Sequence, residues 1–144
     1  MTLALQTPAP DAALPRSRNT AFRAGWAMSG LVIAFLAMDG AMKLSQLPIV
    51  SETSGQLGWP NDPATINLLG ILLLGSTLLY AVPRTAMLGA ILLTGYLGGA
   101  VATHVRIASP LFSHVLFGVY IGLLAWGGLW LRDPRVRALL PLRR

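Results

Sequence analysis

The sequence predicts an all-α integral membrane protein that folds as a four-helix bundle. Hydrophobic residues make up 54% of its 144 positions, charged residues 11%, and the mean hydropathy is +0.63. Soluble domains carry about 25% charged residues, so this chain cannot cover an ordinary water-facing surface. The net charge of +6 comes from arginines that flank apolar runs, which favours a lipid bilayer over nucleic acid as the partner. The absence of cysteine excludes disulfides and thiolate chemistry by the chain itself.

Four apolar runs are long enough to cross a hydrocarbon core, which needs about 20 helical residues. They lie at about 22–44, 64–82, 85–107 and 111–131. Helices are expected because a bilayer offers no water to satisfy an open backbone. The second and third runs are separated by residues 83–84, so their helices should form a tight antiparallel pair.

The chain divides into a membrane domain over 22–132 and two tails. Residues 1–21 are polar and rich in proline, and we expect a disordered cytoplasmic tail. They lack the short apolar core of a cleavable signal peptide, so the first span is interpreted as a retained anchor. Residues 133–144 are expected to form a basic cytoplasmic tail.

Charge counting predicts the orientation of the bundle. With four spans, both termini and the second loop share one side of the membrane. Lys43 and Arg106 lie on the other side. The termini side carries nine arginines: Arg16, Arg18, Arg23, Arg84, Arg132, Arg135, Arg137, Arg143 and Arg144. This bias predicts that the N- and C-termini are cytoplasmic.

Tryptophan and tyrosine residues are expected to mark the two boundaries of the bilayer. Trp26, Tyr80 and Trp130 fall near the inner boundary, and Trp59 falls near the outer one. Such aromatic belts anchor membrane helices at the level of the headgroups.

A set of ionisable side chains gathers at the outer level of three spans. Its members are Asp39, Lys43, His104, Arg106 and His114, and the neighbouring segments add Glu52 and Asn67. Asp39 lies about one turn below the outer edge, where an ionisable group is costly and indicates function. The inner half of the bundle carries no comparable set.

Simpler interpretations of these residues stay open. Asp39 and Lys43 are four residues apart and would form an interfacial ion pair, and His104 and Arg106 would be ordinary loop residues. A metal or an axially ligated haem is the weaker alternative, because the two histidines lack a paired ligand spacing. Acid–base chemistry is a further alternative, because a partly desolvated carboxylate beside histidines can hold or relay a proton.

Small residues recur at four-residue spacing in the last two spans. Gly95, Gly99 and Thr103 form one such stripe, and Gly118 and Gly122 form another. Close helix packing is the favoured explanation, and a smooth wall for a flat lipophile is the alternative. Tyr96, on an adjacent stripe below His104, is expected to hydrogen-bond a neighbouring helix or contact a ligand.

The first outer loop is expected to contain a short amphipathic helix. The segment 48–57 begins with Pro48 and is followed by Gly58, which are start and stop signals. This helix should lie on the outer surface and partly cover the polar set, as a lid or as a structural cap.

Several segments together resemble the DoxX-like family of small four-span bacterial membrane proteins. The likeness covers about 25–144, and it is carried by residues 35–44, 56–60, 79–85, 88–106 and 110–135. In the family pattern a Gly-x-x-Lys segment matches Gly40 and Lys43, and a Thr-His-x-Arg segment matches His104 and Arg106. The resemblance implies a multi-pass protein of the bacterial cytoplasmic (inner) membrane, associated with membrane redox complexes and quinone. The lack of cysteine weakens a role in sulfur oxidation.

Three functions are consistent with these features. In the first, a redox-associated protein binds a small lipophile such as a quinone in an outward-facing pocket. Asp39, His104 and His114 would handle protons, while Lys43 and Arg106 would hold a polar head group; the remaining contacts would come from Tyr96, Asn67 and Glu52. The second is an acid–base isomerase, cyclase or hydrolase acting on a lipophilic substrate. The third is a non-catalytic accessory subunit of a membrane oxidoreductase, as a homo-oligomer or with a redox partner.

Overall fold

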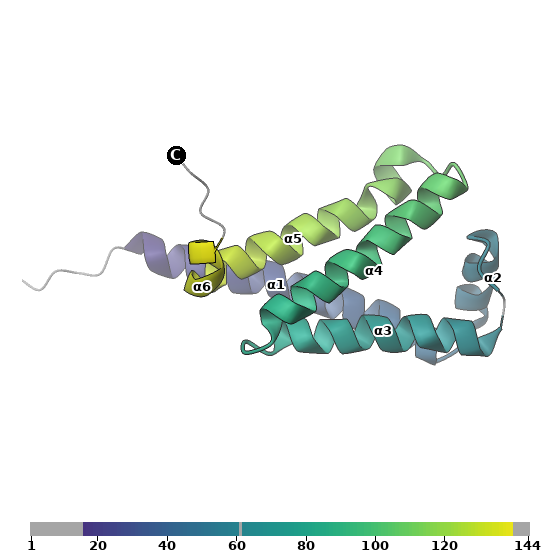
Figure 1. Ribbon diagram of the computed structural model, residues 1–144, viewed down its shortest axis with the longest axis horizontal. Coiled ribbons are helices and arrows are strands. Elements are labelled where there is room, and N and C mark those ends of the chain that lie inside the picture. Colours follow the sequence, from purple (N-terminus) through teal and green to yellow (C-terminus); the bar gives the residue numbers. More distant parts are fainter. Residues whose placement is uncertain (1–15, 61, 140–144) are drawn as a thin grey trace, which may run out of the picture.

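Figure 1 shows the computed structural model, which describes residues 16–60 and 62–139. Within these ranges the chain is helical and contains no strand, which confirms the all-α prediction. The elements in chain order are α1 (Arg16–Leu44), α2 (Pro48–Gln56), α3 (Pro63–Ala81), α4 (Ala86–Arg106), the π-helical turn η1 (Leu111–Val115), α5 (Phe117–Arg132) and α6 (Pro134–Leu139).

Within the described residues, four helical segments are long and apolar enough to span a membrane. They cover Asn19–Leu44, Pro63–Ala81, Ala86–Arg106 and Leu111–Arg132. At most 28% of the residues in each apolar window are buried inside the protein, so most of this apolar surface faces outward. An outward-facing apolar surface of this extent on four long helices indicates a lipid bilayer environment. The prediction of four helices long and apolar enough to span a membrane is confirmed.

The first helix begins earlier than expected. It starts at Arg16, so residues 16–21 are helical and not part of a disordered tail. The rest of that expected tail, residues 1–15, lies outside the described residues, as do residues 140–144 of the basic tail. At the other end of the molecule, the predicted short helix is confirmed as α2, with Pro48 in its first turn.

Asp62 defines the start of α3. Its backbone is extended, its carboxylate accepts a hydrogen bond from the Thr65 backbone N–H (2.8 Å), and Pro63 follows in the first helical turn. Proline suits this position because the first helical N–H has no partner within the helix. The Thr65 hydrogen bond favours the charged carboxylate, which lowers the pKa of Asp62 below its ordinary value of 3.8.

We expect Asp62→Ala to lower the melting temperature in a pH-dependent way. The pKa of Asp62 is lower in the folded protein than in the unfolded chain. The carboxylate therefore contributes its full stabilisation at pH values above the pKa of the unfolded chain. This stabilisation is lost as the pH falls through the folded pKa. The difference in melting temperature between the wild type and Asp62→Ala should therefore be full at neutral pH and vanish in acid. Thermal unfolding of Asp62→Asn, a neutral cap, provides the control. A pH-independent deficit in Asp62→Ala would contradict this account.

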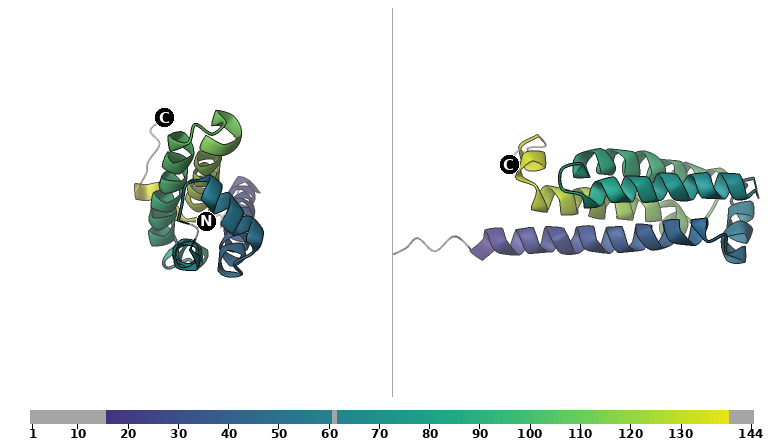
Figure 2. Two further views of the ribbon diagram at one scale, coloured as in Figure 1. Left: turned by 90° about the vertical axis from the view of Figure 1, so that its right-hand side faces the viewer. Right: turned by 90° about the horizontal axis from the view of Figure 1, so that it is seen from below.

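The long helices surround a narrow apolar core. Helix α3 packs against α4, and α4 packs against α5. Helix α1 packs against both α3 and α5, so the four helices form a ring. Figure 2 shows this ring along the bundle axis. The core contains, among others, Val32, Leu36, Leu73, Leu93 and Leu129.

Tyr80 belongs to this core and is not a belt residue, which corrects the sequence-based expectation. Its side chain is 0% exposed, and its hydroxyl lies 2.9 Å from Ser29 Oγ and donates to the Ala125 carbonyl oxygen at 2.7 Å. These bonds join α3 to α1 and α5. A buried phenol needs such partners, because no water is available to satisfy it.

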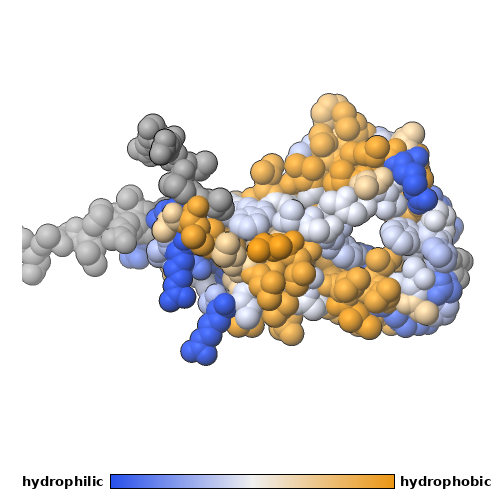
Figure 3. All heavy atoms as spheres, viewed as in Figure 1, coloured by the Kyte–Doolittle hydropathy of each residue, from blue (hydrophilic) through white to orange (hydrophobic). Residues whose placement is uncertain are grey.

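The bundle is tight at one end and splayed at the other. Helices α3 and α4 are close at their connecting turn and diverge toward the end where α2 lies (Figure 1). We call these the α6 end and the α2 end. At the tight end Gly89 lies against the α3 backbone: a Cβ there would stand 2.6 Å from the Leu79 carbonyl carbon. Figure 3 shows that the molecule is hollowed at the α2 end, between apolar surfaces.

Candidate functional site

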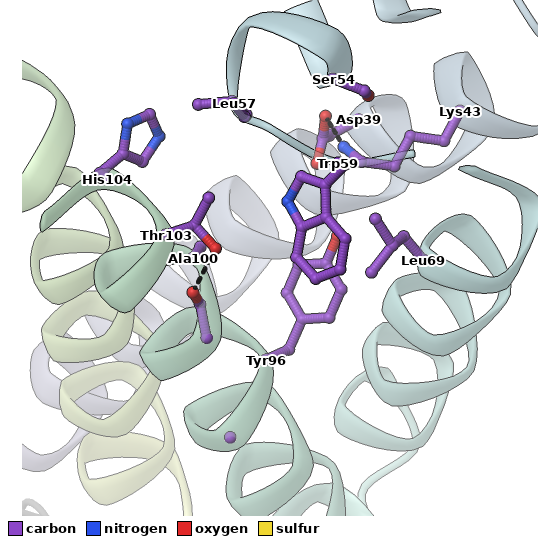
Figure 4. Close-up of a pocket in the computed structure, with 12 residues that line it drawn as sticks. Asp39, Lys43, Ser54, Leu57, Trp59, Leu69, Tyr96, Ala100, Thr103 and His104 are labelled. Atoms are coloured by element: carbon purple, nitrogen blue, oxygen red, sulfur yellow. Dashed lines mark hydrogen bonds and ion pairs between the residues drawn. The ribbon is translucent and has the colours of Figure 1, made fainter. Parts of the chain in front are cut away.

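A cavity of about 360 Å³ occupies the splayed end of the bundle. Helices α1, α3 and α4 form its walls, and α2 with the following connection covers it (Figure 4). Its lining residues are Asp39, Lys43, Ser54, Leu57, Trp59, Leu69, Gly95, Tyr96, Gly99, Ala100, Thr103 and His104. Most of this lining is apolar, and the polar groups lie at a few defined points, as is usual for small-molecule sites.

An ion pair within α1 forms part of the lining. Lys43 Nζ lies 2.6 Å from Asp39 Oδ1, and both side chains are partly buried. The four-residue spacing places both groups on the same helix face. The ion pair that the sequence suggested between Asp39 and Lys43 is therefore present. Because both residues also line the cavity, the pair presents a carboxylate and an ammonium group to whatever occupies it.

The glycine stripe of α4 forms an open wall of the same cavity. No atom of the described residues beyond the local helix lies within 4 Å of a Cβ placed at Gly95 or at Gly99. Close helix packing, the favoured explanation for this stripe, is therefore wrong for these two glycines. It holds for Gly118 of α5, where a Cβ would stand 3.0 Å from Val101 and 3.2 Å from the Leu97 carbonyl oxygen.

A second, smaller cavity of about 170 Å³ adjoins the first, between α1, α4, η1 and α5. Asp39, Tyr96, Ala100 and His104 line both cavities, and His114 lines the smaller one. One carboxylate and two imidazoles from separate helical elements thus come together around a common space. The predicted stripe of Tyr96, Ala100 and His104 lies between the two cavities.

The two histidines contact one another and are each held by a serine. Their rings meet edge to face, with centroids 5.6 Å apart. His104 Nδ1 lies 3.0 Å from Ser109 Oγ, and His114 Nδ1 lies 2.8 Å from Ser113 Oγ. His104 is partly buried, whereas His114 is exposed on η1. A neutral imidazole bonded at one nitrogen can accept or donate a proton at the other.

The other residues expected at the site lie around it. Arg106 donates from Nη2 to the Leu57 carbonyl oxygen (2.8 Å), which ties α4 to the end of α2, and it lines a separate surface pocket. The Oδ1 atom of Asn67 is buried and has no hydrogen-bond partner in the described part of the chain, but Asn67 does not line the cavity. Glu52 is exposed on α2 and does not line it either.

Sequence reasoning missed several lining residues, of which Trp59 is the largest. It was expected to be a belt residue, yet its indole points into the cavity from the connection between α2 and α3, facing the region into which Tyr96 points from α4 (Figure 4). The signal was its place directly before Pro60, in a connection that contains two prolines, Pro60 and Pro63.

The site offers proton-transfer groups and an apolar wall. Among residues 16–60 and 62–139, no three His, Asp or Glu side chains gather in a way that could hold a metal ion. The polar groups of the site concentrate at Asp39, Tyr96 and His104, which line both cavities.

Four long apolar helices and a hydrophobic exterior indicate a multi-pass membrane protein. A family model described as the DoxX-like family matches residues 27–128, and the chain belongs to this family. Among curated proteins and among solved structures, no match to the chain was found.

Proposed function

We propose that the protein binds a small, flat lipophile of the quinone class in the larger cavity at the α2 end. The observation that carries this proposal is the open wall formed by Gly95 and Gly99, which no neighbouring helix fills. A cavity of about 360 Å³ falls in the range of ligand sites, about 300–1,000 Å³. A backbone wall without side chains suits the face of a planar ring.

The polar lining supports a ligand with hydrogen-bonding oxygens at one end. Tyr96 and His104 provide groups that can donate to a carbonyl oxygen, and Trp59 provides an aromatic surface. Lys43 adds a positive charge beside this end of the cavity. Arg106 is already bonded to the Leu57 carbonyl, so its part is to hold the cover formed by α2 and the following loop.

The proposed proton path runs from the surface to the ligand. His114 is exposed, its ring contacts His104, and His104 lines both cavities together with Asp39. Reduction of a quinone to a quinol consumes protons at its oxygens, and its oxidation releases them. A chain of imidazoles ending at a carboxylate can carry such protons. In this proposal the membrane is the bacterial inner membrane, both termini are cytoplasmic, and the electrons come from a redox partner.

The binding of decylubiquinone to the purified protein in nanodiscs tests the proposal. Quinones quench indole fluorescence at short range, so we expect saturable quenching in the wild type that is largely lost in Trp59→Phe. Trp126→Phe is the matched control: Trp126 lies outside the cavity and bonds Thr94 Oγ1 (2.8 Å). Two results would contradict the proposal: quenching that does not saturate with decylubiquinone concentration, or an equal loss of quenching in Trp59→Phe and Trp126→Phe. Either would mean that the quinone only collides with the protein from the bilayer.

A further inference from the structure

The α6 end of the bundle contains a buried arginine, although the sequence suggested no polar set in this half. Arg132, the last residue of α5, is 6% exposed. Its guanidinium lies between two rings, with Cζ 4.4 Å from the Trp26 ring centroid and 5.0 Å from that of Tyr80. Its Nη2 donates to the Tyr80 carbonyl oxygen at 3.0 Å. Charge counting had assigned Arg132 to the cytoplasmic loops.

The hydrogen bonding of Arg132 is incomplete. Both Nε and Nη1 are buried and have no partner among the described residues. A buried donor without an acceptor costs about 1–3 kcal/mol, and more when it is charged. The aromatic rings stabilise the cation but accept no conventional hydrogen bond from its edge. The described residues therefore leave two nitrogens of the Arg132 guanidinium without an acceptor.

Arg132 lines a cavity of about 390 Å³ at this end of the bundle. Arg84, from the turn between α3 and α4, and Arg135, from α6, line it too, with Phe22 and Trp26 on the α1 side. The single carboxylate in the lining is Asp133, which accepts from the Arg135 backbone N–H (2.9 Å) and forms no ion pair with the three described arginines. The lining thus carries three positive charges against one negative charge.

We propose that this cavity binds a phosphate group, and that its source is the head group of an anionic phospholipid. Arginine N–H groups match phosphate oxygens in geometry and charge. The aromatic residues Phe22 and Trp26 are 48% and 38% exposed beside the cavity, where the acyl chains would begin. Basic pockets between membrane helices suit anionic head groups in this way. The site is independent of the larger cavity at the α2 end and of its proposed ligand.

Native mass spectrometry of the full chain, released from bilayers of equal phosphatidylglycerol and phosphatidylcholine, tests the lipid source. We expect phosphatidylglycerol to be retained preferentially, and the preference to fall by about tenfold in Arg84→Gln/Arg135→Gln. Both residues are exposed, so this variant should fold even if substitutions at Arg132 do not. Arg23→Gln is the matched control, since Arg23 is an exposed arginine that does not line the cavity.

A second arm distinguishes free phosphate from lipid. The melting temperature of the protein in phosphatidylcholine nanodiscs is measured in sodium phosphate and in sodium chloride of matched ionic strength. Protection by phosphate, without any preference for phosphatidylglycerol, would assign the site to a soluble phosphate. The proposal is overturned if neither source binds, or if Arg23→Gln weakens binding as much as the double variant does.

Discussion

Gly99→Leu is expected to abolish saturable binding of decylubiquinone while leaving the bundle folded. The Cβ position of Gly99 meets no atom of the described residues beyond the local helix within 4 Å, and Gly99 lines the larger cavity. The leucine Cβ would therefore meet no neighbouring helix, and the rest of the side chain would enter the proposed ligand space. Overpacking an occupied site costs about 1–3 kcal/mol, so the affinity should fall by about 5- to 150-fold.

Gly98→Leu is the matched control for this experiment. Gly98 precedes Gly99 on the same helix and is equally free of close neighbours in the described chain, but it lines an apolar groove between α4 and α5 instead. Its substitution should leave the affinity for decylubiquinone unchanged, as measured by tryptophan quenching. Equal binding by the wild type and both variants would exclude the larger cavity as the binding site.

Gly89→Ala is expected to have the largest effect on stability. A Cβ at this position would stand 2.5 Å from Tyr80 Cα and 2.6 Å from the Leu79 carbonyl carbon. These are backbone atoms, which cannot move aside as a flexible side chain can. Helices α3 and α4 would have to separate at their tight end, and we expect a loss of about 3 kcal/mol, near the upper end of overpacking penalties.

Gly75→Ala on α3 separates this steric effect from helix propensity. No described atom beyond the local helix lies within 4 Å of its Cβ position, so alanine should stabilise the helix by about 0.5–1 kcal/mol. Reversible unfolding of both variants in detergent, followed by circular dichroism, measures the difference. Similar stability of Gly89→Ala and Gly75→Ala would show that α3 and α4 do not need their close contact.

The parts of the fold that depend on local composition could be predicted from the sequence. Span positions follow from run length and hydropathy, and the start of α2 follows from Pro48. The meeting of Asp39, His104 and His114 could also be anticipated, because the rise per residue places them at one depth once the spans are known. Depth, however, does not specify the direction of a side chain. For that reason Glu52 and Asn67, expected at the same level, do not line the cavity.

The parts that depend on helix crossing could not be predicted. A glycine stripe has the same sequence pattern whether a helix packs on it, as at Gly118, or whether it borders a cavity, as at Gly99. The difference comes from the splay of α3 and α4. Likewise, Arg132 and Tyr80 are residue types common at membrane interfaces, and only the packing of α1, α3 and α5 against one another makes them buried.

The divergence of α3 and α4 has a consequence for how the larger cavity would be loaded. Leu69 of α3 and Gly95 of α4 border it, and these two helices diverge toward the α2 end. Under the proposed function, this flank of the cavity would meet the acyl chains of one leaflet. A lipophile would diffuse in sideways, and its isoprenoid tail would stay among the lipids. Occupancy would then follow the mole fraction of the compound in the bilayer, and selectivity would lie in the ring and not in the length of the tail.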